Sequence, residues 1–303
     1  MKAPAGALNT TVRLPHSDML SSMAVRHTAK ELEREAAASP AARAVPALSL
    51  PEPLAMLVRR GLSPSLSRPD LPFPLNLPDD TADRLAARLD HYAFRLFLRG
   101  AILLGGSFHP EEPTDYLTPA QAREACRDLV ELGLARSVGG GHFRLRFRAR
   151  NFGGTLEWWV ARELRRRLGF AVASGVRSGE PGVGGDLDVV ATAEGKLVYV
   201  ELKSSPPKHL MPAEVGAFLR RVRALRPDLS IFAMDTALRL SDKVLPMFAE
   251  ALGEGPRPGA ERLSRENFRL APSLYAVNAK QDFLENLRLA IADGLRRLAP
   301  PPP

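Results

Sequence analysis

The sequence predicts an α/β protein in which a mixed sheet is flanked by helices and preceded by a mostly helical domain and a proline-rich arm. Three observations support this prediction. After residue 150, apolar runs of strand length such as residues 197–202 alternate with amphipathic segments of helical period. Residues 80–150 carry two helical patterns and one short hairpin pattern. Residues 1–79 are too rich in proline for long helices or central strands.

These patterns divide the chain into three predicted domains, with boundaries at residues 1–79, 80–150 and 151–300. The first is expected to be an arm or linker, partly disordered, with one short helix near residues 19–38. The alternative is an arm that docks on the body of the protein. The density of proline favours the linker.

The second predicted domain begins where the proline spacing ends. Thr81 is expected to cap a helix that continues to about Arg99. Thr118 and Pro119 have the residue types of a helix start, and Gly133 is placed to end that helix. A basic hairpin pattern follows in residues 134–147, with glycines at its turn.

This order of helix and basic hairpin resembles a winged-helix module. The resemblance implies that the helix and the hairpin contact the phosphates of a nucleic acid, and it nominates Arg123, Arg127, Arg144 and Arg146. The alternative is a module that binds other proteins. Lys208, which follows the last acidic strand of the next domain, is a further candidate for phosphate contact.

The third predicted domain alternates helices and strands. A helix is expected to start near Gly154 and to stop at Gly169. Beyond it, strands are expected at residues 170–173, 186–190, 197–202, 230–234 and 274–278, and helices at residues 214–225, 240–252 and 282–298. The glycine-rich run of residues 175–185 is expected to be a loop beside the acidic strand.

Charged residues stand at one end of the hairpin predicted between Gly184 and Ser205. Asp186 and Asp188 are two residues apart and are expected to share a face of the first strand. The second strand ends with Glu201 and Lys203, which also share a face. Converging carboxylates suit a hard divalent cation, and a lysine beside them suits a phosphate or an attacking water. This pattern favours phosphodiester hydrolysis over an ordinary surface salt bridge.

Asp188, followed thirteen residues later by Glu201, Leu202 and Lys203, resembles the signature of the PD-(D/E)XK nuclease superfamily, in its restriction-endonuclease-like and Holliday-junction-resolvase-like branch. Glu157, near the start of the preceding helix, matches the upstream acid of that family. The resemblance implies a restriction-endonuclease-like fold and catalysis by these four charged residues. It also implies that Mg²⁺ or Mn²⁺ binds Asp188, Glu201 and the backbone carbonyl of Leu202, with Glu157 and Asp186 as further candidate ligands.

Composition supports an intracellular protein with a polyanionic partner. The chain has 303 residues, a net charge of +8 and a single cysteine, Cys126. It contains no apolar run of transmembrane length and no secretory signal, so a cytoplasmic location and no membrane partner are expected. A basic balance favours nucleic acid, with DNA expected before RNA. A homodimer is one arrangement that would let two sites cut two strands.

The function predicted from these observations is a magnesium-dependent DNA endonuclease. One alternative is an RNA-directed nuclease effector controlled by the N-terminal modules. Another is a nucleic-acid-binding module of a larger complex that does not cleave. A protein-interaction scaffold is the third, and it would not bind Mg²⁺.

Overall fold

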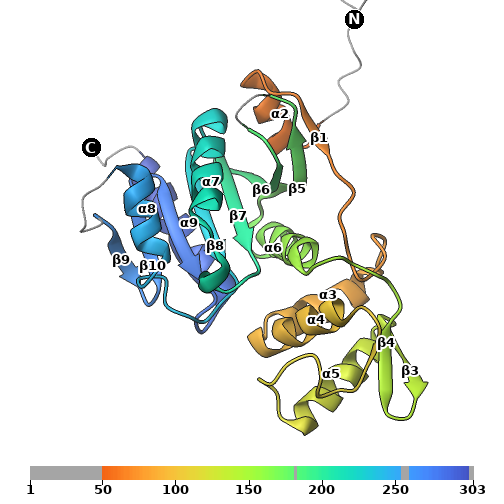
Figure 1. Ribbon diagram of the computed structural model, residues 1–303. Coiled ribbons are helices and arrows are strands. Elements are labelled where there is room, and N and C mark those ends of the chain that lie inside the picture. Colours follow the sequence, from red (N-terminus) through yellow and green to blue (C-terminus); the bar gives the residue numbers. More distant parts are fainter. Residues whose placement is uncertain (1–49, 181–182, 254–258, 300–303) are drawn as a thin grey trace, which may run out of the picture. The chain divides into compact units, whose positions relative to one another are not determined.

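The structure of the protein is a computed structural model that describes residues 50–180, 183–253 and 259–299 (Figure 1). The chain divides into two compact units, Met1–Leu48 and Ser49–Pro303, and every described residue belongs to the second. The helix predicted near residues 19–38 lies outside the described residues. Within them the fold is mixed α/β, as predicted, with eight α-helices and two sheets. None of these helices is long and apolar enough to cross a membrane.

The larger sheet has eight strands in the order β1-β5-β6-β7-β8-β11-β10-β9. Strand β8 pairs in parallel with both β7 and β11, and the other neighbours are antiparallel. The sheet is therefore mixed. Its strands are β1 (Pro64–Leu66), β5 (Ala171–Ser178), β6 (Asp186–Ala193), β7 (Lys196–Lys203), β8 (Leu229–Met234), β9 (Glu261–Ser264), β10 (Asn267–Ala271) and β11 (Leu274–Asn278).

Helices cover both faces of this sheet. Residues Val198 and Tyr199 of β7 enter different apolar core clusters, as strand alternation requires. The first cluster also contains side chains of α6 (Gly153–Leu168) and α9 (Phe283–Leu298). The second contains side chains of α2 (Glu52–Arg59), α7 (Pro212–Leu225) and α8 (Val244–Leu252). Both faces of the central strands are consequently buried, which explains their continuous apolar sequence.

The single helix predicted from Thr81 to about Arg99 is wrong. Two helices occupy this region, α3 (Asp79–Leu89) and α4 (Tyr92–Leu104). Thr81 lies inside α3, whose N-cap is Pro78. The Arg95 side chain donates hydrogen bonds to the carbonyl oxygens of Leu89 and Asp90, at 2.5 and 3.1 Å. These bonds satisfy carbonyl groups that the interruption leaves without helical partners.

The predicted helix at residues 118–133 and the hairpin after it are confirmed. Helix α5 (Pro119–Glu131) begins with a capping box, in which the Thr118 hydroxyl accepts a bond from the Gln121 amide and the Gln121 side chain accepts one from Thr118. The two strands of the hairpin form a three-stranded sheet with β2, which precedes α5, in the order β2 (Ser107–Phe108), β4 (His142–Leu145), β3 (Ala135–Gly139). Phe97, Leu129 and Trp159 belong to one core cluster, so this region and α6 share a continuous core across residue 150.

The described part of the predicted arm is docked on the larger sheet. Strand β1 pairs with β5, and Leu57 of α2 is fully buried in the second core cluster. Arg60 donates to the Leu225 carbonyl oxygen at 3.0 Å and to Asp228 at 3.2 Å. Residues 50–79 thus follow the docked alternative, and the three domain boundaries stay predictions.

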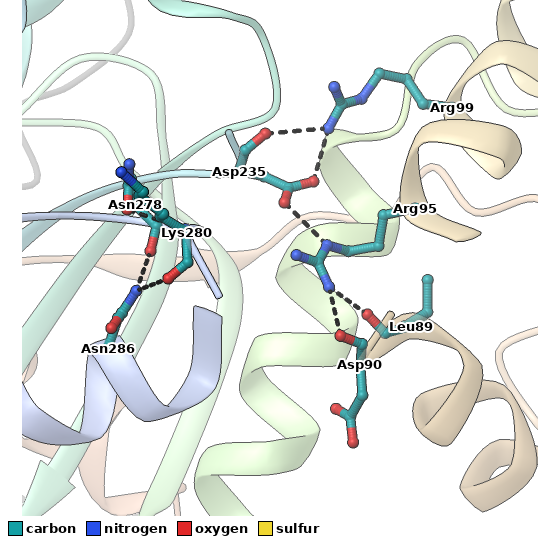
Figure 2. Close-up of polar contacts among 8 residues, drawn as sticks. All are labelled: Leu89, Asp90, Arg95, Arg99, Asp235, Asn278, Lys280 and Asn286. Carbon is teal, nitrogen blue, oxygen red and sulfur yellow. Dashed lines mark hydrogen bonds and ion pairs between the residues drawn. The ribbon is translucent and has the colours of Figure 1, made fainter. Parts of the chain in front are cut away.

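A buried ion pair joins α4 to the end of β8 (Figure 2). Asp235 directly follows β8 and accepts bonds from Arg95 at 2.9 Å and from Arg99 at 2.6 Å. Arg95 is 1% exposed and Asp235 is fully buried. The Arg95 guanidinium lies 4.7 Å from the Trp159 ring centroid, and the Asp235 amide donates to the Lys203 carbonyl oxygen at 2.8 Å. This contact fixes α4 to the same sheet end at which β7 finishes.

Candidate active site

The predicted charged residues lie at the open end of the β6–β7 hairpin. Glu194 and Gly195 form its turn, both with positive φ, as a tight two-residue turn between strands requires. The antiparallel ladder runs from that turn to the pair Val189–Val200. Asp188 and Glu201 come directly after this last pair, so the hairpin brings an acid from each strand to one place.

The regular alternation of β6 breaks at Asp188. Leu187 and Val190 enter the same core cluster, although they are three residues apart. In the ladder with β5, Gly175 and Asp188 fall between the pairs Ser174–Val189 and Val176–Leu187. The predicted common face of Asp186 and Asp188 is therefore not a regular strand face.

Gly175 is the residue that lets Glu157 of α6 approach the end of the β6–β7 hairpin. It lies in β5, so the loop predicted for residues 175–185 starts later, because β5 continues to Ser178. Its φ is +60°, and a Cβ there would lie 2.8 Å from the Ser67 hydroxyl. The same Cβ position is 3.9 Å from a carboxylate oxygen of Glu157. A glycine here lets the backbone pass close to Ser67 and to the Glu157 carboxylate.

Glu201 is buried and held by three partners. Its carboxylate accepts from Arg221 at 2.7 Å, from Lys203 at 3.1 Å and from the Tyr199 hydroxyl. Arg221 also donates to the Tyr199 hydroxyl at 2.9 Å and to the Gly184 carbonyl oxygen at 3.1 Å. A carboxylate that is 2% exposed is consequently compensated by positive charge and hydrogen bonds.

Lys203 is placed to carry a positive charge at neutral pH. Burial opposes that charge, but Glu201 and Glu214, the latter at 3.2 Å, more than offset burial and raise the pKa of the lysine. The predicted common face of Glu201 and Lys203 is confirmed by their contact. A protonated lysine is a hydrogen-bond donor and not a base, which suits a phosphate oxygen or an attacking water.

Glu157 and Asp188 are the acids that lack such compensation. Burial, followed by the negative charges of Asp186 and Glu201, raises the pKa of Glu157 to about 7. Burial and the charges of Glu201 and Glu157 raise the pKa of Asp188 well above its usual range. The Leu202 amide, which donates to Asp188 at 2.6 Å, and Lys203 only partly oppose this effect. The site therefore carries more negative charge than its own residues neutralise.

The donor chemistry of these two acids fits a hard divalent cation. Asp188 uses Oδ2 for the Leu202 amide, and Glu157 accepts no hydrogen bond within the described part of the chain. Mg²⁺ commonly binds through one or two carboxylates and keeps several waters. No group of three or more His, Cys, Asp or Glu side chains suited to a metal ion occurs among the residues with defined positions. The fit thus rests on two carboxylates, with both oxygens of Glu201 already hydrogen-bonded.

Asp186 differs from Glu157 and Asp188 in its exposure and in its hydrogen-bond partner. Its carboxylate is exposed and accepts two bonds from Arg177, at 2.7 and 3.3 Å. Arg177, Asp186 and Glu157 line one open groove of about 950 Å³. Asp186 remains a candidate ligand, and Arg177 is its counter-ion at the mouth of the site.

The five predicted phosphate contacts do not share one surface feature. Arg144 and Arg146 line an open groove of about 1270 Å³ beside the β3–β4 hairpin. Arg123 and Arg127 are exposed on α5 and do not line that groove, and Arg123 lies 3.7 Å from Glu111. Lys208 is exposed in a single 3₁₀ turn, Pro207–His209.

Three contributors to the site were not predicted from the sequence. Tyr199 and Arg221 hold Glu201, and Glu214 holds Lys203. Tyr199 stands two residues before Glu201, so strand alternation was a usable signal for it. Arg221 sits among Arg220 and Arg223 on an amphipathic helix, and no sequence pattern distinguishes the buried arginine from its exposed neighbours.

The sequence matches no protein-family model and no curated protein. Among the solved structures to which the chain is similar, two have low identity and cover most of it. One is Can2 from Sulfobacillus thermosulfidooxidans in complex with cyclic tetra-adenylate, with 16% identity, a TM-score of 0.47, and coverage of 79% of this chain and 59% of that one. The other is protein VC1899 from Vibrio cholerae, with 15% identity, a TM-score of 0.42, and coverage of 80% and 60%. This chain therefore spans about three fifths of the length of either protein.

Proposed function

We propose that the protein is a metal-dependent nuclease that hydrolyses phosphodiester bonds. One observation carries the proposal: Glu157 and Asp188, two acids whose pKa values are raised by burial and by neighbouring negative charges, lie beside a lysine that Glu201 keeps protonated. Buried carboxylates that lie close together repel one another and destabilise the fold. Such a cluster is typical of a functional site. These four residues are the ones that the PD-(D/E)XK signature nominates.

The order of elements around the site supports a restriction-endonuclease-like core. Helix α6 supplies Glu157, β6 supplies Asp188 and β7 supplies Glu201 and Lys203, with α7 and β8 following. This is the order of helix acid, strand acid, turn and strand E-x-K that the resemblance implies. The three helices α3 to α5 with the β3–β4 hairpin likewise fit a winged-helix-like module.

The residues of the chain have separate parts in the proposed reaction. A bound Mg²⁺ or Mn²⁺ would supply an activated water and would offset charge on the phosphate. Asp188 and Glu157 would hold it, and Glu201 and the Leu202 carbonyl are the further ligands that the family signature implies. Lys203 donates to a non-bridging phosphate oxygen and orients the water. Arg221 and Tyr199 fix Glu201, and Glu214 fixes the lysine, so the donor is held in place before substrate arrives.

DNA is the first substrate to test, as a DNA endonuclease is the primary expectation from the sequence. RNA is the alternative, since the charges at the site fit the phosphodiester of either polymer. A module that binds nucleic acid without cutting it is the remaining alternative, and the surplus of acid at the site argues against it.

The test is cleavage of a supercoiled plasmid and a labelled RNA in Mg²⁺, Mn²⁺ or EDTA. Wild type is compared with Lys203→Ala and with Lys196→Gln, a matched change at the opposite end of β7. We expect metal-dependent cleavage that Lys203→Ala abolishes and Lys196→Gln retains. Full cleavage by Lys203→Ala would remove the assignment, and cleavage in EDTA would contradict the role of the metal.

A further inference from the structure

Five arginines line the groove of about 1270 Å³ beside the small sheet, which we call the arginine groove. They come from β3, from β4 and from the segment after β4, and all five are exposed. They are Arg136, Arg144, Arg146, Arg148 and Arg150. The sequence RLRFRAR over residues 144–150 supplies four of them at every second position.

None of these arginines forms an ion pair with an acid in the described ranges. This differs from Arg162, Arg167 and Arg269, each of which contacts a carboxylate. Asp70 also lines the groove, but its carboxylate accepts a bond from the backbone amide of Arg150, at 2.7 Å.

The small sheet even places two of the arginines directly opposite one another. Arg136 of β3 pairs with Arg144 of β4 in the antiparallel register. Like charges directly across a sheet are destabilising, and an anion bound between them would remove that cost. Among the described residues that line the arginine groove, five arginines therefore face a single acid, Asp70, and the groove has an excess of positive charge.

The arginine groove adjoins the part of the candidate active site that Glu157 and Asp186 line. Asp70, Phe147, Arg148 and Arg150 line both it and the groove of about 950 Å³ that contains Glu157 and Asp186. An anionic polymer that lies along the arginines would therefore be led to the acids. This direction of binding rests on the proposed nuclease function, whereas the charge of the arginine groove does not.

Exposed apolar side chains lie among the arginines. Phe147 is 40% exposed and lines both grooves, and Leu104 is 48% exposed and lines the arginine groove. Aromatic side chains beside basic ones are the usual platform for the bases of a single strand, whereas a duplex keeps its base faces stacked inside. We propose that the arginine groove binds single-stranded nucleic acid, with phosphates on Arg144 and Arg148 and a base stacked on Phe147.

The first test measures binding in EDTA, so that cleavage plays no part. Fluorescence anisotropy is recorded with labelled oligothymidylate, oligouridylate and a blunt DNA duplex of equal length, over a range of NaCl concentrations. The double variant Arg144→Gln/Arg148→Gln is compared with Arg223→Gln, an exposed arginine on α7 without an ion pair among the described residues. Arg146 is left unchanged because its side chain donates to the Ala135 carbonyl oxygen at 3.3 Å.

We expect both single strands or one of them to bind more tightly than the duplex. The double variant should reduce the slope of log affinity against log salt by about 1.4, which is roughly 0.7 for each lost phosphate contact on a single strand. Arg223→Gln should leave the slope unchanged. Equal slopes for wild type and the double variant, or tighter binding of the duplex, would overturn the proposal. A difference between the two oligonucleotides identifies DNA or RNA as the preferred strand.

A second variant tests the stacking contact. Phe147→Ala should weaken binding of single strands by about 5- to 100-fold, and Phe147→Trp should restore it. No change in affinity for Phe147→Ala would contradict base stacking. The binding and cleavage assays separate this inference from the proposed function. If wild type and Lys203→Ala both bind single strands but wild type cleaves neither polymer, the arginine groove is supported and the proposed nuclease function is contradicted.

Discussion

Two groups of buried charge lie at the same end of the larger sheet, one after β8 and one at the end of β7. After β8, Asp235 is enclosed by Arg95 and Arg99, and its carboxylate oxygens both accept from guanidinium groups. At the end of β7, Glu201 is equally well matched. Glu157 and Asp188 are not, and burial and their neighbours' negative charges raise the pKa of both.

The comparison shows that burial of charge alone does not indicate a functional site. Asp235 and Arg95 are more deeply buried than Glu157 and Asp188, which form the acid site. The charge of Asp235 is nevertheless paired within the protein, and its role is to join α4 to the sheet. What distinguishes the acid site is charge that the protein does not neutralise. The arginine groove has the same property with the opposite sign.

The largest expected effect comes from removing one of the surplus acids. Asp188→Asn should lower metal-dependent cleavage by at least about 10³-fold, since it removes a proposed ligand of the cation. The melting temperature in EDTA should not fall, because the change also removes repulsion between acids. Single-turnover cleavage and thermal denaturation measure the two effects. Asp186→Asn, two residues earlier, is the matched comparison, and an equal loss of activity there would make Asp186 a ligand as well.

Breaking the ion pairs of Asp235 should change the stability of the protein and not its activity. Arg95→Met leaves Asp235 with one arginine in a buried position and should lower the free energy of unfolding by about 3–5 kcal/mol. Urea denaturation measures the change. The double variant Arg95→Met/Asp235→Asn should be less destabilised than the sum of the single variants, whereas strict additivity would show that the two side chains are not coupled.

The acid site should also give stability a distinctive dependence on pH. The pKa of Glu157 is raised to about 7 in the folded protein, so its protonated form is favoured there. Without metal, stability should therefore decline as pH rises from the ordinary glutamate range to about 7. Glu157→Gln should remove the part of this decline that Glu157 causes and add about 1–3 kcal/mol at pH 8, while Asp188, whose pKa is also raised, keeps its own part. Thermal melting in EDTA from pH 5 to 8 tests it, and parallel curves for both proteins would contradict it.

The smallest effect is expected from the hydroxyl of Tyr199. Tyr199→Phe removes one bond to Glu201 and one from Arg221, but leaves both charges that neutralise Glu201. We expect a loss of about 1 kcal/mol in unfolding free energy. Urea denaturation would show it. A loss as large as that of Arg95→Met would mean that the hydroxyl, and not the ion pairs, is the main compensation.

The parts of the fold that follow from local rules were predictable. The β6–β7 hairpin, the ending of α6 at Gly169 and the capped start of α5 depend on alternation, glycine and capping residues. The break between α3 and α4 was not predictable, because the carbonyl groups that it leaves free of helical bonds accept hydrogen bonds from the side chain of Arg95. Strand β1 was missed in a proline-rich region, where Pro64 occupies the first position of an edge strand and proline is tolerated.

The same limit applies to the candidate site. The signature residues could be named because the hairpin brings its own ends together. The roles of Arg221 and Arg148 could not be predicted. The sequence of a helix or a loop gives its charged residues, but not the residues that the tertiary structure places opposite them. Whether Glu157, Asp188, Glu201 and Lys203 act in catalysis stays a prediction.

We infer that the surplus negative charge at the end of β7 serves to bind a cation. Isothermal titration calorimetry with Mn²⁺ tests it directly and needs no knowledge of the substrate. We expect binding to wild type that is lost in Asp188→Asn and weakened in Glu157→Gln, but kept in Glu285→Gln, where the altered acid already pairs with Arg288 at 2.7 Å. Binding of equal strength to all four proteins, or no binding to wild type, would contradict it.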